Sequence, residues 1–356
     1  MKHLLLIFSF LLSYTLSFAQ IEWIDTVYNF GTFHEESGIQ YGKIRFVNIS
    51  SEPTSINRVK TTCGCTVADY PKDEIMPGDT AIINFLFNPE GRLGKFEKAI
   101  KISYGFNNET FNIKIRGRII GKSNTLKNQY PIDAGALRLN HNSIIIGDIT
   151  KGKSRHEFIH IYNQSNDTLC LGLQNVPPTI SAGISDEKIF PGDIATISLY
   201  FNSIIEQNLG LNIYKFDITT IENGITKTIP IEVTAYIKEQ QKNLSQEEVK
   251  NAPMIFVDNS LIDLGNITAD KKIINASFQI SNEGKSELKI NRIYSIDKSI
   301  KIKRMPSKIS AGKKYDVDIE INPELISSTI FNIRLEIISN DPLHPTTTVR
   351  VVGQKK

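Results

Sequence analysis

The sequence Cys63-Gly64-Cys65 contains the side chains with the clearest capacity for chemistry in this chain. Two thiols separated by one glycine can close a short, strained disulfide of the kind that exchanges readily with other thiols. The same pair can donate two thiolates to a soft metal ion such as Cu(I) or Zn(II), although a closed tetrahedral site needs further ligands. His34 and Met76 are candidate ligands only if the fold brings them close to the two sulfurs.

A structural role for Cys63 and Cys65 is the third interpretation, in which they end a strand and pack locally as thiols or as a disulfide. The sequence favours this role, because the Cys-X-X-Cys spacing of thioredoxin-like sites and their βαβ context are both absent. No cofactor is predicted, and the metal alternative stays open. Cys170, between Leu169 and Leu171, is expected to be a buried free thiol.

Catalytic motifs of the common kinds are missing from the sequence. It has no Gly-X-Ser-X-Gly nucleophile elbow, no P-loop, no His-Glu-X-X-His and no dinucleotide-binding glycine pattern. Glu35 and Glu36 follow His34, but their position just before Gly38 is typical of a solvated loop and not of an acid–base pair. We therefore expect a protein that is not an enzyme.

The first nineteen residues have the features of a secretory signal peptide. Lys2 precedes an apolar run over residues 4–12, and Ser17 and Ala19 place small side chains at positions minus three and minus one of a cleavage site. Cleavage there leaves Gln20 as the first residue. We expect an exported protein, with no membrane insertion after cleavage.

Charge and cysteine content narrow the classes of partner and the source of stability. The chain has 41 Lys and Arg against 38 Asp and Glu, a net charge of +3, and loss of Lys2 with the signal peptide leaves 40 minus 38, or +2. Such a balance gives no electrostatic basis for binding nucleic acid. Three cysteines are too few for a disulfide framework, so packed cores must supply the stability.

One pattern occurs three times along the chain. Gly31, Gly147 and Gly265 stand 116 and 118 residues apart (147 − 31 and 265 − 147). Strand-ending asparagines and turn sequences follow in the same order in each copy: Asn48, Asn163 and Asn282, then Pro77-Gly78-Asp79, Pro191-Gly192-Asp193 and Ala311-Gly312-Lys313. Markers in constant order at near-constant spacing predict three copies of one domain.

Apolar residues alternate with polar ones within each copy, as in the segments 111–116, 197–201 and 331–337. This period of two predicts half-buried strands, and their spacing between turn residues predicts an all-β protein of three tandem immunoglobulin-like antiparallel β-sandwiches. The expected domains are 20–120, 131–238 and 254–356, after a signal peptide at 1–19. Linkers are expected at 121–130 and 239–253, and the capping-box spacing of Ser245 and Glu248 predicts one or two helical turns in the second.

The repeated turn sequence has a sufficient structural explanation. Proline presets one turn torsion, and glycine accepts the positive φ that a type II turn requires. Seven residues are therefore assigned to turns before strands and not to ligand binding: Pro77, Gly78, Asp79, Pro191, Gly192, Asp193 and Gly312.

The first copy also carries a set of motifs in a fixed order. They are Phe30-Gly31, Phe46-Val47-Asn48, Thr62-Cys63-Gly64-Cys65-Thr66, Ile75-Met76-Pro77-Gly78-Asp79, Phe85-Leu86-Phe87 and Gly94-Lys95-Phe96. With them, residues 22–120 resemble an exported bacterial family called domain of unknown function 1573. That family is common in Bacteroidetes, and its domains are similar to the immunoglobulin-like domains of the hydin and abnormal-spindle group. The resemblance implies an immunoglobulin-like fold and a periplasmic or secreted location in a Gram-negative bacterium, but no reaction or ligand. It weakens over the later copies, which lack Cys-Gly-Cys.

Two functions remain. The first is a noncatalytic envelope protein with a structural or protein-interaction role through tandem immunoglobulin-like domains, whose partner is an envelope protein or polymer. The alternative is a thiol-active or soft-metal-handling envelope protein that uses Cys63 and Cys65.

Overall fold

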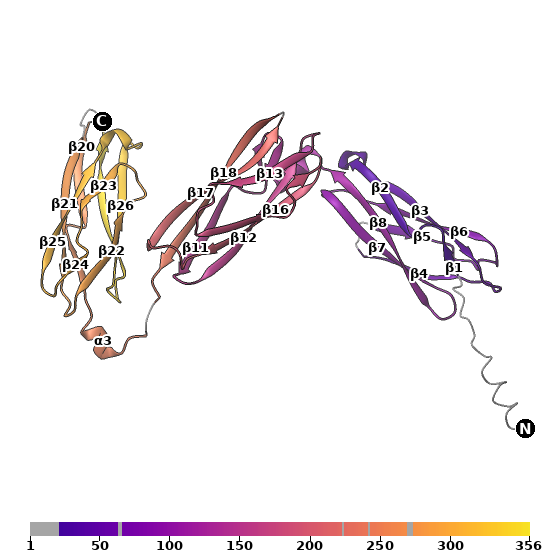
Figure 1. The fold of residues 1–356 in the computed structure, drawn as a ribbon, viewed down its shortest axis with the longest axis horizontal. Coiled ribbons are helices and arrows are strands. Elements are labelled where there is room, and N and C mark those ends of the chain that lie inside the picture. The colour runs from indigo at the N-terminus through magenta and orange to yellow at the C-terminus, as the bar shows by residue number, and fades with distance from the viewer. Residues whose placement is uncertain (1–20, 63–65, 223, 241–242, 269–272) are drawn as a thin grey trace, which may run out of the picture.

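The computed structural model describes residues 21–62, 66–222, 224–240, 243–268 and 273–356. The predicted signal peptide and the pair Cys63 and Cys65 lie outside these residues. The described chain is all-β, and its six sheets form three sandwiches that follow one another along the chain (Figure 1). The fold class predicted from the alternation is confirmed.

The first sandwich is built from two four-stranded sheets. One has the order β1 (Ile21–Trp23), β3 (Gln40–Asn48), β6 (Thr80–Phe87), β5 (Thr66–Asp69). The other has the order β2 (Val27–His34), β8 (Glu109–Ile120), β7 (Gly94–Tyr104), β4 (Ile56–Thr61). Their inward faces bury an isoleucine- and phenylalanine-rich core that includes Ile44, Phe46, Ile83, Phe87 and Ile100. Trp23 stacks on Phe111 with ring centroids 4.9 Å apart at the edge of this core.

The second sandwich has two five-stranded sheets. One has the order β14 (Ile180–Ile184), β16 (Ile194–Asn202), β12 (Ser154–Asn163), β10 (Leu137–Leu139), β9 (Ile132–Ala134). The other has the order β11 (Ser143–Thr150), β18 (Ile225–Lys238), β17 (Gly210–Glu222), β13 (Leu169–Gln174), β15 (Lys188–Ile189).

The third sandwich has one four-stranded and one five-stranded sheet. One sheet has the order β19 (Ile255–Asp258), β21 (Ile274–Asn282), β25 (Lys314–Ile321), β23 (Ile300–Arg304). The other has the order β20 (Leu261–Ile267), β27 (Thr346–Lys355), β26 (Ile330–Ser339), β22 (Leu288–Tyr294), β24 (Lys308–Ile309). Short helical elements lie outside the sheets: η1 (Glu35–Ser37), α2 (Ser123–Gln129), α3 (Gln246–Lys250) and η2 (Pro323–Leu325).

Each sandwich departs from a purely antiparallel arrangement at one pair of strands. β2 runs parallel to β8, β11 to β18 and β20 to β27. The register of each pair shifts at the repeated glycine, where Gly31, Gly147 and Gly265 have φ of +70°, +73° and +62°. These glycines therefore mark bulges in an edge strand, because a side chain rarely tolerates that φ.

The second linker contains the predicted helical turn. Ser245 caps α3 by accepting a hydrogen bond from the backbone N–H of Glu248, and the Glu248 side chain accepts one from the N–H of Ser245. This capping box is confirmed. The described residues contain no helix that is long and apolar enough to cross a membrane.

Cys170 is exposed, so the expectation of a buried thiol is wrong. It stands in β13 between Leu169 and Leu171, and both leucines point into the core. Side chains alternate along a strand, so two inward neighbours force the residue between them outward.

A fully buried asparagine holds the loops at one end of each sandwich. Asn48, Asn163 and Asn282 have no exposed surface. Each Nδ2 donates hydrogen bonds to two backbone carbonyl oxygens: those of Glu52 and Ile75, of Asp167 and Ile189, and of Ser286 and Ile309. The backbone carbonyl oxygen of each asparagine also accepts a hydrogen bond from the N–H of the turn glycine, at 2.8 to 2.9 Å. The asparagine therefore fixes both the strand end and the following turn.

We predict that Asn163→Ala lowers the free energy of unfolding of the second sandwich by about 2 to 4 kcal/mol, because two buried carbonyls lose their donor. Urea denaturation of the full chain measures it. Asn332→Ala, on the exposed face of β26, is the matched control and should change this free energy by less than about 0.5 kcal/mol. Equal effects of the two variants would contradict the bracing role.

Candidate functional site

The strands on either side of Cys63 and Cys65 belong to different sheets of the first sandwich. β4 ends at Thr61 and β5 begins at Thr66 in the opposite sheet. Thr61 Oγ1 donates to the carbonyl oxygen of Thr66 over 2.9 Å, so the two strand ends lie side by side. The backbone N–H of Thr62 donates to Ala99 O, which ties the residue after β4 to β7. The cysteines themselves are outside the described residues.

The two further ligands considered for a metal lie at opposite ends of the first sandwich. His34 is the last residue of β2 and pairs with Ile120 at one end. Met76 belongs to the turn before β6 at the other end, where the N–H of Asp79 donates to its carbonyl. They cannot complete one site together. Among the described residues, no three His, Cys, Asp or Glu side chains are grouped to hold a metal ion.

The seven turn residues occupy the positions that the sequence assigned to them. Gly78, Gly192 and Gly312 have φ of +83°, +77° and +69°, each in a turn that precedes the long strand β6, β16 or β25. The aspartates of the first two turns differ in their surroundings. Asp79 is exposed, whereas Asp193 is 5% exposed and lies against the first sandwich.

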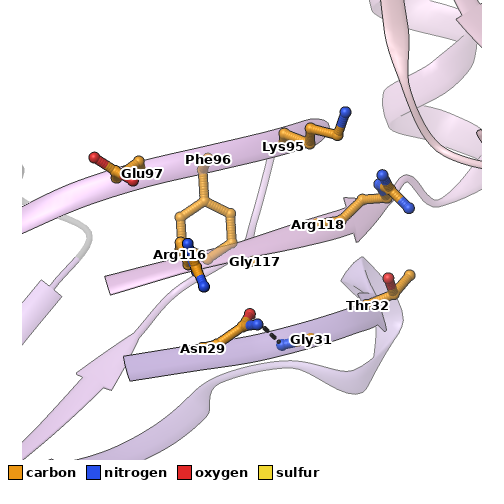
Figure 2. A pocket seen from close by; sticks show the side chains of 9 residues that line it. All are labelled: Asn29, Gly31, Thr32, Lys95, Phe96, Glu97, Arg116, Gly117 and Arg118. Carbon is orange, nitrogen blue, oxygen red and sulfur yellow. Dashed lines mark hydrogen bonds between the residues drawn. The ribbon is translucent and has the colours of Figure 1, made fainter. Parts of the chain in front are cut away.

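A shallow cavity of about 470 Å³ lies on the outer face of β2, β8 and β7. Figure 2 shows its lining, with Lys95 and Arg118 at one end and Glu97 and Arg116 towards the other. Arg118 and Lys95 both reach Asp193 of the second sandwich, so their charges are already engaged. The cavity therefore belongs to the first sandwich, and two of its lining residues also contact the second sandwich.

The junction between these two sandwiches, called joint 1–2 below, contains a three-residue charge cluster. Arg118 Nε lies 2.8 Å from Asp193 Oδ1 in an ion pair outside hydrogen-bond geometry, and Arg118 Nη2 donates to Oδ2 over 3.3 Å. Lys95 Nζ lies 3.4 Å from Oδ2. The ring of Phe190 lies under the guanidinium, whose central carbon is 5.4 Å from the ring centroid. Arg118 is largely buried, which strengthens the pair relative to an exposed one.

Glycines allow the two sandwiches of joint 1–2 to approach closely. A Cβ on Gly94 would lie 3.0 Å from Ile194 Cδ1, and a Cβ on Gly192 would lie 3.1 Å from Ile120 Cγ1. Both glycines also have positive φ, of +75° and +77°. A side chain at either position would separate the two surfaces and strain the backbone.

Glu35 lies beside joint 1–2 and is buried. The expectation that it belongs to a solvated loop is therefore wrong. Glu35 is only 4% exposed, because the linker folds over η1. Its Oε1 accepts hydrogen bonds from the N–H of Gly91 and from Thr125 Oγ1, and its Oε2 accepts one from the N–H of Lys122. Burial raises the pKa of Glu35, but these three hydrogen bonds and the Lys122 ammonium together hold the pKa below its ordinary value.

The linker between these sandwiches is packed into the joint. Tyr162 is fully buried, and its hydroxyl accepts a hydrogen bond from the N–H of Gly121 over 3.0 Å. It packs with Leu126 and Tyr130 of the linker and with Leu93 of the first sandwich. Burial raises the pKa of Tyr162, which keeps the hydroxyl neutral.

The second and third sandwiches meet at joint 2–3, which uses tyrosines. The Tyr294 hydroxyl accepts from the N–H of Leu211 over 2.8 Å and donates to Glu336, to which Tyr236 also donates. A Cβ on Gly210, where φ is +84°, would lie 2.5 Å from Ile338 Cδ1, so glycine is required here too. Arg292 Nη1 donates to the carbonyls of Leu209 and Leu211 over 2.8 and 3.1 Å.

In both joints, the residues that contact the next sandwich stand at equivalent positions of the sheet. Lys95 pairs with Arg118 across β7 and β8, and Leu211 pairs with Tyr236 across β17 and β18. In each case the residue on the last strand binds a carboxylate of the next sandwich, Asp193 or Glu336. Sequence reasoning named Asp193 only as a turn residue and missed the other contact residues. One signal was present, since Tyr162 is an aromatic residue at an outward-facing position of β12.

Comparison with known proteins gives a family for one part of the chain. Residues 21–119 match the sequence model of the family described as protein of unknown function (DUF1573). The first sandwich is a DUF1573 domain. The DUF1573 match ends at residue 119, next to Arg118, which forms an ion pair with Asp193 of the second sandwich. A search of curated proteins gives no match.

Comparison with solved structures gives several similar chains. A protein of unknown function from Porphyromonas gingivalis W83 is 13% identical over 62% of this chain and 100% of its own, with a TM-score of 0.50. The ASH / PapD-like domain 7 of human CEP192 is 11% identical (31% and 93% covered, TM-score 0.25). The periplasmic chaperone SfaE is 12% identical (62% and 100% covered, TM-score 0.24). The likeness to the Porphyromonas gingivalis protein, at 13% identity, shows a shared fold alone.

We predict that Glu35→Gln lowers the free energy of unfolding of the first two sandwiches by about 2 to 3 kcal/mol at pH 7, because a side-chain NH₂ then faces a buried donor. Glu36→Gln, at the exposed neighbour, is the matched control and should have almost no effect. Urea denaturation of the full chain measures both.

The same carboxylate sets a pH dependence. The folded pKa of Glu35 lies below its unfolded value, so its contribution is complete above the ordinary carboxyl range and is lost as the pH falls through the folded pKa. The difference between wild type and Glu35→Gln should therefore shrink as the pH is lowered from about 5 towards 3. A constant difference over that range would show that the charge of Glu35 does not stabilise the joint.

Proposed function

We propose that this protein is a noncatalytic, exported envelope protein in which three sandwiches form a stiff spacer that presents the DUF1573 domain to a partner. The observation that carries the proposal is the burial of Asp193 between Arg118 and Lys95, which belong to a different sandwich. Asp193 accepts one hydrogen bond within its own turn, from the N–H of Phe190, but loss of its cations would leave a buried charge poorly compensated. The joint therefore favours one arrangement of the two sandwiches.

The first linker and the contacts of joint 2–3 support the same role. A flexible string of domains needs exposed, polar linkers. Here the first linker forms α2, whose Thr125 and Leu126 are buried against the sandwiches that it connects. At joint 2–3 the buried phenol of Tyr294 hydrogen-bonds to groups of both sandwiches. The arrangement suits a protein that keeps its ends at a fixed separation.

The compartment and the class of partner complete the proposal. The signal-peptide features of residues 1–19 support export to the periplasm or beyond. The near-neutral charge of the chain favours a protein or polymer of the envelope over nucleic acid as the partner.

Small-angle X-ray scattering of the mature chain tests the spacer. We predict one fixed shape for the wild type, with a maximum dimension that does not change with salt. Asp193→Lys places a third cation against Lys95 and Arg118, so it should open joint 1–2 and broaden the distribution of interatomic distances. Asp186→Lys, an exposed charge reversal on the same sandwich, should leave the scattering unchanged.

Two results would reject the spacer. One is wild-type scattering that only an ensemble of freely oriented sandwiches reproduces. The other is an Asp193→Lys profile that overlays the wild-type profile.

The thiol or metal alternative calls for a separate measurement. Mass spectrometry of the mature protein, with and without reductant and with added Cu(I) or Zn(II), reports the state of Cys63 and Cys65 directly. For the noncatalytic role we expect the same mass with and without added metal after desalting. A stoichiometric metal adduct that Cys63→Ser and Cys65→Ser both abolish, but Cys170→Ser does not, would favour the alternative.

A further inference from the structure

The DUF1573 domain has a second end, on the side away from joint 1–2, where three loops meet. We call it the free end, and it comprises residues 48–55, 74–79 and 105–108. Backbone hydrogen bonds join these loops: Gly78 N–H to Asn48 O, Thr54 N–H to Ile75 O with its reciprocal bond, and Gly105 N–H to Ser55 O. In Figure 1 this end lies at the right, where β1 and β4 begin, opposite the second sandwich.

The corresponding end of the second sandwich is the surface that docks in joint 1–2. Its turn glycine, Gly192, donates to Asn163 O over 2.9 Å, as Gly78 donates to Asn48 O over 2.8 Å. Two residues before each glycine stand Phe190 and Met76, and one residue after stand Asp193 and Asp79. The two ends therefore present an apolar side chain and a carboxylate from the same turn. In the second sandwich they meet Arg118 and Lys95.

No described residue of another sandwich covers the corresponding surface at the free end, which also carries further apolar side chains. Met76 is 52% exposed, Ile49 is 51% exposed, and Phe106 at the tip of the β7–β8 hairpin is 92% exposed. Exposed carboxylates surround them: Glu52, Asp73, Glu74 and Asp79. The one exposed lysine in the neighbouring loop, Lys72, lies over the ring of Tyr70, 3.1 Å from its centroid.

A small cavity lies within this surface. It measures about 250 Å³ and is lined by Pro53, Thr54, Ser55, Asn57, Glu74, Gly105 and Phe106. Asn57 Nδ2 donates to Gly105 O over 2.7 Å and to Asn108 Oδ1 over 2.7 Å, which fixes the hairpin tip beside the cavity. The cavity has room for one apolar side chain, with a carboxylate at its wall and an aromatic ring at its rim.

We propose that the free end of the DUF1573 domain docks a basic protein segment that carries an apolar anchor side chain. The anchor enters the cavity against Phe106, and the lysines or arginines pair with Glu74 and Asp79. Charge complementarity selects this occupant, since the same turn in the second sandwich is paired with an arginine and a lysine within the chain itself. A second copy of the free end is disfavoured, because its carboxylates would repel these.

The third sandwich provides an internal contrast. Its turn has the same backbone, in which Gly312 N–H donates to Asn282 O over 2.8 Å, but Ser310 and Lys313 replace the apolar residue and the carboxylate. The same turn thus carries the opposite charge. It also shows that lysine is compatible with this position, so Asp79→Lys should fold normally.

The inference deepens the proposed spacer role, since it names the surface that the spacer presents. The test is fluorescence anisotropy of a labelled synthetic peptide with three lysines and one phenylalanine, titrated with the full mature chain at low salt. Asp79→Lys should weaken binding by about fivefold and Phe106→Ser by about tenfold. Leu343→Ser, which alters an exposed leucine in the corresponding hairpin loop of the third sandwich, should bind like the wild type.

The proposal is overturned if Asp79→Lys and Phe106→Ser bind the peptide as the wild type does. It is also overturned if a peptide with glutamates in place of the lysines binds equally well, or if Leu343→Ser weakens binding as much as Phe106→Ser. None of these results alters the scattering profile of the wild type, so failure of the docking surface is distinguishable from failure of the spacer.

Discussion

The buried asparagine at the end of one strand is the constraint on which each sandwich depends. Its side-chain amide donates hydrogen bonds to two backbone carbonyl oxygens, and its own backbone carbonyl oxygen accepts one from the N–H of the turn glycine. These groups are shielded from water, so leaving any of them without a partner costs about 1 to 3 kcal/mol. The turn is therefore held in one conformation in all three copies, whatever side chains it carries.

A fixed turn with variable side chains explains how one domain type serves different contacts. In the second sandwich the turn bears Phe190 and Asp193 and packs into joint 1–2. In the DUF1573 domain it bears Met76 and Asp79 and faces solvent, and in the third sandwich it bears Ser310 and Lys313. The scaffold sets where the side chains stand, and each copy sets what they bind.

The sequence predicted the local features of this fold, because they depend on neighbouring residues. Alternation of apolar and polar residues marks strands that are buried on one face, and a capping box marks α3. The same alternation explains why Cys170 is exposed, because Leu169 and Leu171 on either side of it point into the core. No local sequence pattern marks the residues that form the two joints. Glu35 and Thr125 are 90 residues apart, and Arg118 and Asp193 are 75 apart, so only the folded chain brings these partners together.

The charge of a single turn residue also makes the order of the three copies matter. If the third sandwich stood in the place of the second, Lys313 would occupy the position of Asp193 and face Arg118 and Lys95. If a copy of the DUF1573 domain stood there, Asp79 would preserve the attraction. A duplication or exchange of gene segments would therefore be tolerated in one arrangement and rejected in the other, so the history of this chain is constrained by electrostatics as well as by fold.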